Sequence, residues 1–170
     1  NEAYLTRFDS AGFNIWLQVE SGAASMDTLI PIVLNRYKHH SCVRGFGVDV
    51  EWFFANTNSG GRKVTDAEAQ SWEQRVKAVN PSYTLFLKHY ATSWMPPTFR
   101  GNILFVDDSQ QFTSLTQMVN EFKAWGSKFS PNAVAFQFGY KIDTTWWKQY
   151  ADPALTIGTA LRSAIANMSG

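Results

Sequence analysis

The chain lacks several features by which common functional classes are recognised. It has one cysteine, Cys42, among 170 residues, which excludes an internal disulfide bond and a cysteine-based metal cluster. Cys42 stands just before an apolar segment, where a small buried thiol is the expected state. No apolar run is long enough to cross a bilayer, and we find no signal peptide, so any secretion signal is expected to have been removed.

An excess of charge of one sign is also lacking. Lys and Arg number 15 against 14 Asp and Glu, which gives a formal net charge of +1. No strong field therefore attracts nucleic acid, and no nucleic-acid partner is expected. The histidines (His39, His40 and His89) show neither the His-x-x-x-His nor the His-Glu-x-x-His spacing. For that reason we expect no metal site and no cofactor.

Aromatic residues, by contrast, make up 15% of the chain, and segments of strand-like and helix-like periodicity alternate along it. Strands are expected at 13–20, 43–52, 83–90, 102–107 and 133–140. Helices are expected at 2–11 and 26–39, after the capping-box pair Thr65 and Glu68, after Ser114, and after Asp152-Pro153. A polar, glycine-bearing loop is expected at 55–63 and a second loop at 91–100.

This alternation predicts a single α/β domain over residues 1–170, with parallel strands and right-handed crossovers. A closed (β/α)8 barrel needs eight strands and typically ~250 residues. The five expected strands therefore indicate a TIM-type (β/α) barrel-like domain that is incomplete, or an open doubly wound sheet. Because a helix opens the chain with no strand before it, we expect a domain truncated at its N-terminus or an atypical barrel.

The most informative segment is Asp49-Val50-Glu51, at the end of the second expected strand. Residues two apart on a strand point the same way, so Asp49 and Glu51 are expected to share one face. An apolar strand has no structural need for two acids on one side. In parallel α/β folds the carboxyl end of a strand is where chemistry takes place. The other face is expected to be filled by Phe46, Val48, Val50 and Trp52.

Polar side chains end the other expected strands as well. Carboxylates at such an edge supply an acid, base or nucleophile, amides and lysine hold hydroxyl groups, and aromatic rings stack on sugars. The pattern therefore predicts a sugar-processing cleft. Besides Glu51 and Asp49 as catalytic residues, its expected substrate-binding residues are Glu20, Gln18, Trp52, Lys88, Tyr90, Asp107, Gln137 and Tyr140.

These motifs resemble those of barrel-fold glycoside hydrolases. Asp49-Val50-Glu51 is similar to the Asp-x-Glu of family 25 lysozymes, and Phe136-Gln137-Phe138 resembles their aromatic-Gln-aromatic motif. That resemblance implies that Glu51 is the proton donor and that Asp49 assists. Residues 47–53 partly follow the strand motif of family 18 chitinases, in which Phe53 would replace the catalytic Glu and imply an inactive protein.

Together the motifs predict hydrolysis of a β-linked amino-sugar polysaccharide, similar to peptidoglycan or chitin, with Glu51 as general acid. Burial beside Trp52 and the charge of Asp49 are both expected to raise the pKa of Glu51. The alternative is a non-catalytic carbohydrate-binding, surface or assembly protein on a degenerate barrel, completed by association with another chain. Either function is expected outside the cell or at its surface.

Overall fold

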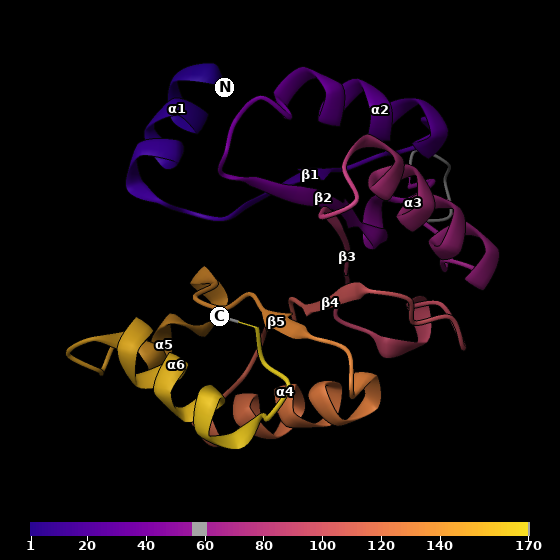
Figure 1. Cartoon of the computed structure of the whole chain (residues 1–170). Helices are drawn as coiled ribbons and strands as arrows, with labels where there is room; N and C mark the ends of the chain where they lie inside the picture. Colours follow the sequence, from indigo (N-terminus) through magenta and orange to yellow (C-terminus); the bar gives the residue numbers. More distant parts are fainter. Residues whose placement is uncertain (56–60, 170) are drawn as a thin grey trace. The chain divides into compact units, whose positions relative to one another are not determined.

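The computed structural model describes residues 1–55 and 61–169, which form two compact units (Figure 1). Unit 1 comprises Asn1–Lys88 and Ser93–Ile103, and unit 2 comprises His89–Thr92 and Leu104–Gly170. Each unit has its own parallel strands and its own buried aromatic and aliphatic side chains. The expectation of an α/β fold with parallel strands is thereby confirmed.

In unit 1, strand β2 pairs in parallel with β1 on one side and β3 on the other. The register sets Val48 opposite Val19 and Leu87, and sets Asp49 opposite Lys88. The carboxyl ends of the three strands therefore lie together at one edge. The elements of this part of the chain are α1 (Glu2–Ala11), β1 (Ile15–Val19), α2 (Met26–Tyr37), β2 (Val43–Asp49), η1 (Val50–Trp52), α3 (Asp66–Val79), β3 (Thr84–Lys88) and η2 (Thr92–Trp94).

Strand β2 is buried on both faces, as is usual for a central parallel strand. Its neighbours approach so closely that a Cβ at Gly45 would lie 1.9 Å from the carbonyl oxygen of Thr84. Only glycine therefore fits at this position. Helices α2 and α3 pack against each other and against these strands (Figure 1). Their buried faces contribute Met26, Ile30, Leu34, Ala69, Trp72 and Val76 to the core.

In unit 2, strand β4 pairs in parallel with β5, and helix α4 packs against both β5 and α6. The core is aromatic: the ring of Phe105 stacks on that of Phe129 at 4.2 Å, and Phe122 stacks on Phe136 at 4.5 Å. Trp125 donates its indole N–H to the carbonyl of Phe105 at 3.3 Å. The elements are β4 (Ile103–Asp107), α4 (Leu115–Phe129), β5 (Val134–Phe136), η3 (Lys141–Asp143), α5 (Thr144–Trp147) and α6 (Pro153–Ala164).

Local sequence signals placed most elements correctly. Thr65 and Glu68 form the expected capping box, and Gly12 ends α1 with a φ of 72°. One expected boundary is wrong in a way that matters for function: the strand expected at 43–52 ends at Asp49, and Val50–Trp52 forms a 3-10 turn. The last expected strand, 133–140, is shorter and covers only Val134–Phe136.

The expected polar loop and the expected lack of a membrane span can also be compared with the structure. Within the loop expected at 55–63, residues 56–60 lie outside the described part of the chain. Among the residues that the structure describes, no helix is both long and apolar enough to cross a membrane.

Candidate functional site

Three neighbouring strand ends in unit 1 bring polar side chains into contact. Asp49, the last residue of β2, accepts a hydrogen bond at Oδ2 from Gln18 Nε2 of β1 at 3.2 Å. Lys88 Nζ, at the end of β3, lies 2.7 Å from the same oxygen. Asp49 and Lys88 are only 3% and 7% exposed. We call Gln18, Asp49 and Lys88 the Asp49 cluster.

The Asp49 cluster joins residues that the sequence assigned to different roles. Asp49 was expected to assist catalysis, whereas Gln18 and Lys88 were expected to bind substrate. Removing two charges from water is costly, so a buried ion pair is weak evidence for stability. A buried and specifically paired carboxylate at the carboxyl end of a parallel strand is instead a candidate for a functional site. The Lys88 ammonium group and the Gln18 amide both contact Oδ2 of Asp49 and fix the position of this carboxyl group.

Glu51 and Trp52 follow Asp49 in the turn η1, which is closed by a hydrogen bond from Phe53 N to Val50 O at 3.0 Å. The expectation that Asp49 and Glu51 share one strand face is therefore wrong, because the strand stops before Glu51. Glu51 is half-buried. Trp52 was expected to fill the apolar face, but it is 45% exposed, since the turn directs it away from the core.

A pocket of about 440 Å³ also lies in unit 1, where the chain enters α2 and α3. Its floor includes Phe53, which directly follows η1, and Trp72 of α3. The guanidinium of Arg62 lies over the ring of Phe53 at 4.5 Å and also pairs with Glu68. None of the catalytic or substrate-binding residues predicted from the sequence lines this pocket. The lining residues are Ala23, Ala24, Ser25, Met26, Asp27, Phe53, Phe54, Arg62, Ala67, Glu68, Ser71 and Trp72.

The strand end in unit 2 centres on Asp107, which is fully buried at the end of β4. Its Oδ1 accepts a hydrogen bond from Ser109 N at 2.8 Å, whereas Oδ2 has no hydrogen-bond partner among the described residues. Burial raises the pKa of Asp107 to about 7; hydrogen bonds from Ser109 oppose the shift, and the charges of Glu121 and Asp108 add to it. Asp107 can therefore hold or release a proton near neutral pH.

Two other predicted residues, Tyr90 and Gln137, make hydrogen bonds near this strand end through their backbone groups. Gln137 N donates to the carbonyl of Asp107 at 2.9 Å, and Ser109 Oγ donates to the carbonyl of Tyr90 at 3.3 Å. Tyr90 is exposed, and its ring stacks on His89 at 4.3 Å. Gln137 is also exposed, whereas Tyr140 is half-buried. In unit 1, Glu20 is exposed just past the end of β1.

Sequence reasoning missed Asp143, a second buried carboxyl group in unit 2. Its Oδ1 has no hydrogen-bond partner among the residues described. Burial raises its pKa, although backbone N–H groups of Phe112 and Gln111 oppose the shift. Asp143 lies in the 3-10 turn η3, beyond any strand, so the strand-end pattern could not find it. The available signal was a single acid within an aromatic-rich stretch, from Phe136 to Trp147.

Sequence spacing also missed one group of side chains that could hold a metal ion. Within the described ranges, Glu2, His39 and His40 place one ligand atom each within 4.8 Å of one another. Glu2 and His39 are 37 residues apart in the sequence, so no local motif marks the group. Cys42, which follows shortly after, is buried as expected, and burial raises its pKa to about 11. Its thiol is thus an unreactive core group.

Comparison of the chain with protein-family models, with curated proteins and with solved structures finds no match. The function therefore has to be argued from the residues and geometry of the two strand ends.

Proposed function

We propose that the protein is a glycoside hydrolase that cleaves a β-linked amino-sugar polysaccharide similar to peptidoglycan or chitin. Glu51 acts as general acid and Asp49 as the fixed carboxylate beside it. The observation that carries this proposal is the Asp49 cluster: a buried Lys88–Asp49 pair at the carboxyl ends of adjacent parallel strands, two residues before a half-buried glutamate.

The chemistry follows from what each group offers. Cleavage of a glycosidic bond needs a proton on the leaving oxygen and stabilisation of positive charge on the sugar ring. In this proposal the half-buried Glu51 donates the proton, which its partial exposure to solvent supports. Asp49, whose position is fixed by its contact with Lys88, stabilises the oxocarbenium-like charge in this proposal. The exposed ring of Trp52 offers a stacking surface for a sugar face.

The remaining predicted residues take supporting roles in this proposal. In unit 1, the exposed side chains of Gln18 and Glu20 are proposed to contact sugar hydroxyl or acetamido groups. For unit 2, taken by itself, the same role is proposed for the exposed Tyr90 and Gln137 and for the half-buried Tyr140. Asp107 is fully buried, so we propose that it supports its strand end from within. We also propose that the parallel strands belong to a TIM-type barrel, which another chain completes, and that the protein works outside the cell.

The competing proposal is a carbohydrate-binding protein without hydrolytic activity. Two observations favour it. Asp49 is already engaged by both Lys88 and Gln18. Phe53, which takes the place of the catalytic glutamate in the family 18 resemblance, is buried and cannot act on a sugar. The exposed ring of Trp52 in unit 1, or that of Tyr90 in unit 2, would still offer a stacking surface for polysaccharide without a competent acid.

One experiment separates the two proposals. The purified protein is incubated with peptidoglycan and with chitin oligosaccharides, and new reducing ends are measured alongside the fraction of protein bound to the polymer. Release of reducing ends supports the hydrolase. Binding without release favours the binding protein, and absence of both contradicts each proposal.

A further inference from the structure

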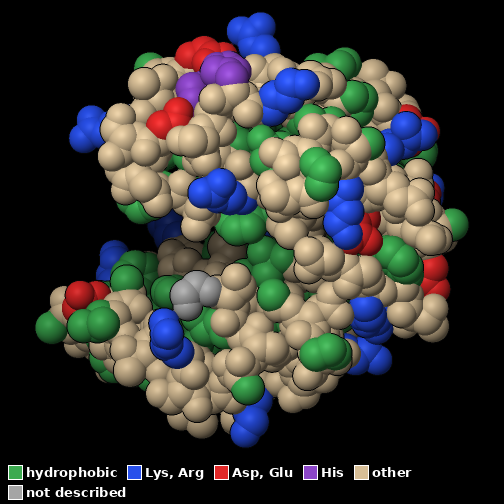
Figure 2. Space-filling model, in the orientation of Figure 1, with side chains coloured by type: hydrophobic (Ala, Val, Ile, Leu, Met, Phe, Trp, Pro, Cys, Tyr) green, Lys and Arg blue, Asp and Glu red, His purple; other side chains and the backbone are tan. Residues whose placement is uncertain are grey.

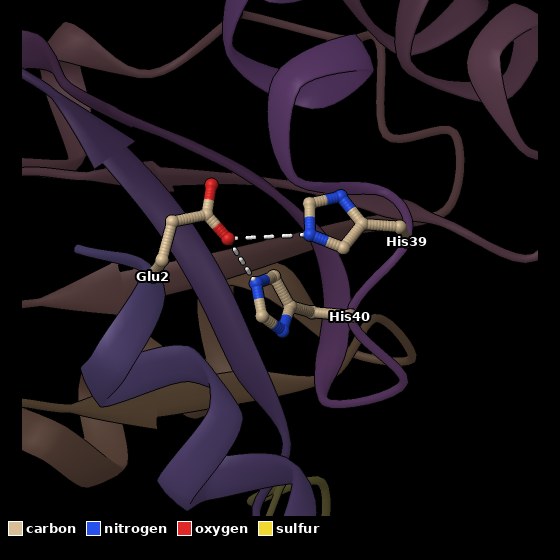
Figure 3. Close-up of side chains that lie close together, drawn as sticks. All are labelled: Glu2, His39 and His40. Carbon is tan, nitrogen blue, oxygen red and sulfur yellow. Dashed lines mark hydrogen bonds and ion pairs between the residues drawn. The ribbon is translucent and has the colours of Figure 1, made fainter.

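The side chains of Glu2, His39 and His40 converge on one point in unit 1 (Figure 3). Glu2 Oε2 lies 3.2 Å from His39 Nε2 and 2.8 Å from His40 Nε2. Glu2 belongs to the first turn of α1, whereas the two histidines follow the end of α2. Three side chains that can bind a metal thus meet from two separate segments.

These distances are close to those of a metal site. Ligand atoms that bind a tetrahedral zinc ion at its usual bond lengths of roughly 2.0–2.1 Å lie about 3.3 Å apart. The two separations from Glu2 Oε2, 3.2 Å and 2.8 Å, are both shorter than that value. Small side-chain rotations, without movement of the helices, would therefore admit an ion.

His40 is held in the manner of a metal ligand. Its Nδ1 lies 2.7 Å from Asp9 Oδ2, which leaves Nε2 directed at Glu2. A carboxylate bound to the far nitrogen of a metal-binding histidine fixes the ring and its tautomer. Asp9 is itself fixed, because its Oδ1 accepts hydrogen bonds from Cys42 N at 2.7 Å and Ser41 Oγ at 3.1 Å.

Burial and charge also suit a divalent ion. The His40 side chain is 5% exposed, whereas those of His39 and Glu2 are 60% and 49% exposed. The site is therefore walled on one side and open to solvent on the other. Figure 2 shows histidine side chains at the surface beside acidic ones. The carboxylates of Glu2 and Asp9 supply two negative charges, and Arg36 approaches only the other oxygen of Glu2, at 3.7 Å.

We propose that Glu2 Oε2, His39 Nε2 and His40 Nε2 bind a divalent transition-metal ion of the zinc class, with Asp9 as the outer carboxylate that orients His40. Two imidazoles and one carboxylate favour zinc and its neighbours over calcium or magnesium, which prefer oxygen ligands only. Water completes the coordination from the solvent side. Any proton on His40 Nε2 leaves to solvent as the ion binds. The bound ion links α1 to the segment between α2 and β2.

The proposal is tested by titrating the metal-free protein with Zn²⁺ in competition with a chromophoric chelator, and by recording the absorption spectrum with Co²⁺. We expect one ion per chain and a tetrahedral Co²⁺ spectrum. His39→Ala, a change at a side chain that is 60% exposed, should weaken Zn²⁺ binding by about tenfold or more. Asp9→Asn should weaken it roughly 10–100-fold, as outer-carboxylate changes do.

Lys38→Ala is the matched control. Lys38 precedes the histidines, and its Nζ donates to Asn35 Oδ1 at 2.9 Å, away from the three ligands. This variant should bind Zn²⁺ with the affinity of the unmodified protein. Absence of one-to-one binding in the unmodified protein would overturn the proposal. Equal Zn²⁺ affinity in His39→Ala and Lys38→Ala would overturn it as well.

Discussion

Lys88 Nζ and Asp49 Oδ2 lie 2.7 Å apart at the ends of neighbouring parallel strands, and both side chains are buried. The parallel register of β2 and β3 makes the two residues direct partners. Each charge therefore offsets part of the cost of burying the other.

Lys88→Met should consequently destabilise unit 1 strongly. It removes the ammonium group that lies 2.7 Å from the buried Asp49 carboxyl group, and the expected loss in the free energy of unfolding is about 3–5 kcal/mol by chemical denaturation. The double variant Asp49→Leu/Lys88→Met should recover much of that loss, because neither charge remains buried.

Arg75→Gln is the control for this change. Arg75 pairs with Asp27, but both side chains are about half exposed. Its loss should cost about 0–1 kcal/mol. Similar losses for Lys88→Met and Arg75→Gln would contradict the description of the Lys88–Asp49 pair as a buried pair.

Asp107 should make stability depend on pH. Its pKa rises from 3.8 in the unfolded chain to about 7 in the folded protein because the carboxyl group is buried. A raised folded-state pKa contributes stability that is fully present below pH 3.8 and is lost as the pH rises to about 7. Relative to the unmodified protein, Asp107→Asn should therefore gain stability across this window, by an amount on the order of a few kcal/mol.

Denaturation curves of both proteins, measured at intervals from mildly acidic to neutral pH, test this expectation. Asparagine keeps the size of the side chain but cannot ionise, so a difference in slope reports the carboxyl group. If the two stability curves run parallel over the window, Asp107 does not titrate there.

The capping box of Thr65 and Glu68, which the sequence predicted correctly, can be tested by substitution of Thr65. Its Oγ1 accepts a hydrogen bond from Glu68 N at 3.3 Å, and Glu68 Oε2 accepts one in return from Thr65 N at 3.0 Å. Thr65→Ala should cost about 1 kcal/mol of unfolding free energy. Ser25 occupies the same N-cap position in α2, but its side chain makes no capping hydrogen bond. Ser25→Ala should therefore cost clearly less, and equal losses in the two variants would contradict the capping role of the Thr65 side chain.

Such local signals explain how much of the fold the sequence could predict. The Thr65–Glu68 cap, the turn at Gly12 and the apolar periodicity act between residues close in the chain, and they placed the helices and the parallel strands. The boundary at Asp49 was not predictable in this way. Val50 and Trp52 continue the apolar alternation of β2, yet the chain turns there through a hydrogen bond from Phe53 to Val50.

For the candidate site too, single residues could be predicted from local sequence, but contacts between distant residues could not. Polar strand ends were visible in the sequence, so Gln18, Asp49 and Lys88 could each be selected. Their mutual contact depends on the register of three strands, which no local pattern states. The Glu2, His39 and His40 group was hidden for the same reason, because the packing of α1 brings its ligands together. Asp143 lies in the turn η3 and not at the end of a strand, so the strand-end pattern could not identify it.

The central claim is that Glu51 donates the proton in sugar cleavage, and one comparison of turnover tests it most directly. Glu51→Gln is compared with Glu121→Gln, a change at an exposed glutamate on α4, using an oligosaccharide that the unmodified protein cleaves. Removing a general acid should lower kcat by about a hundredfold or more while substrate binding is largely retained, and Glu121→Gln should leave kcat unchanged. Turnover by Glu51→Gln at the rate of the unmodified protein would contradict the account.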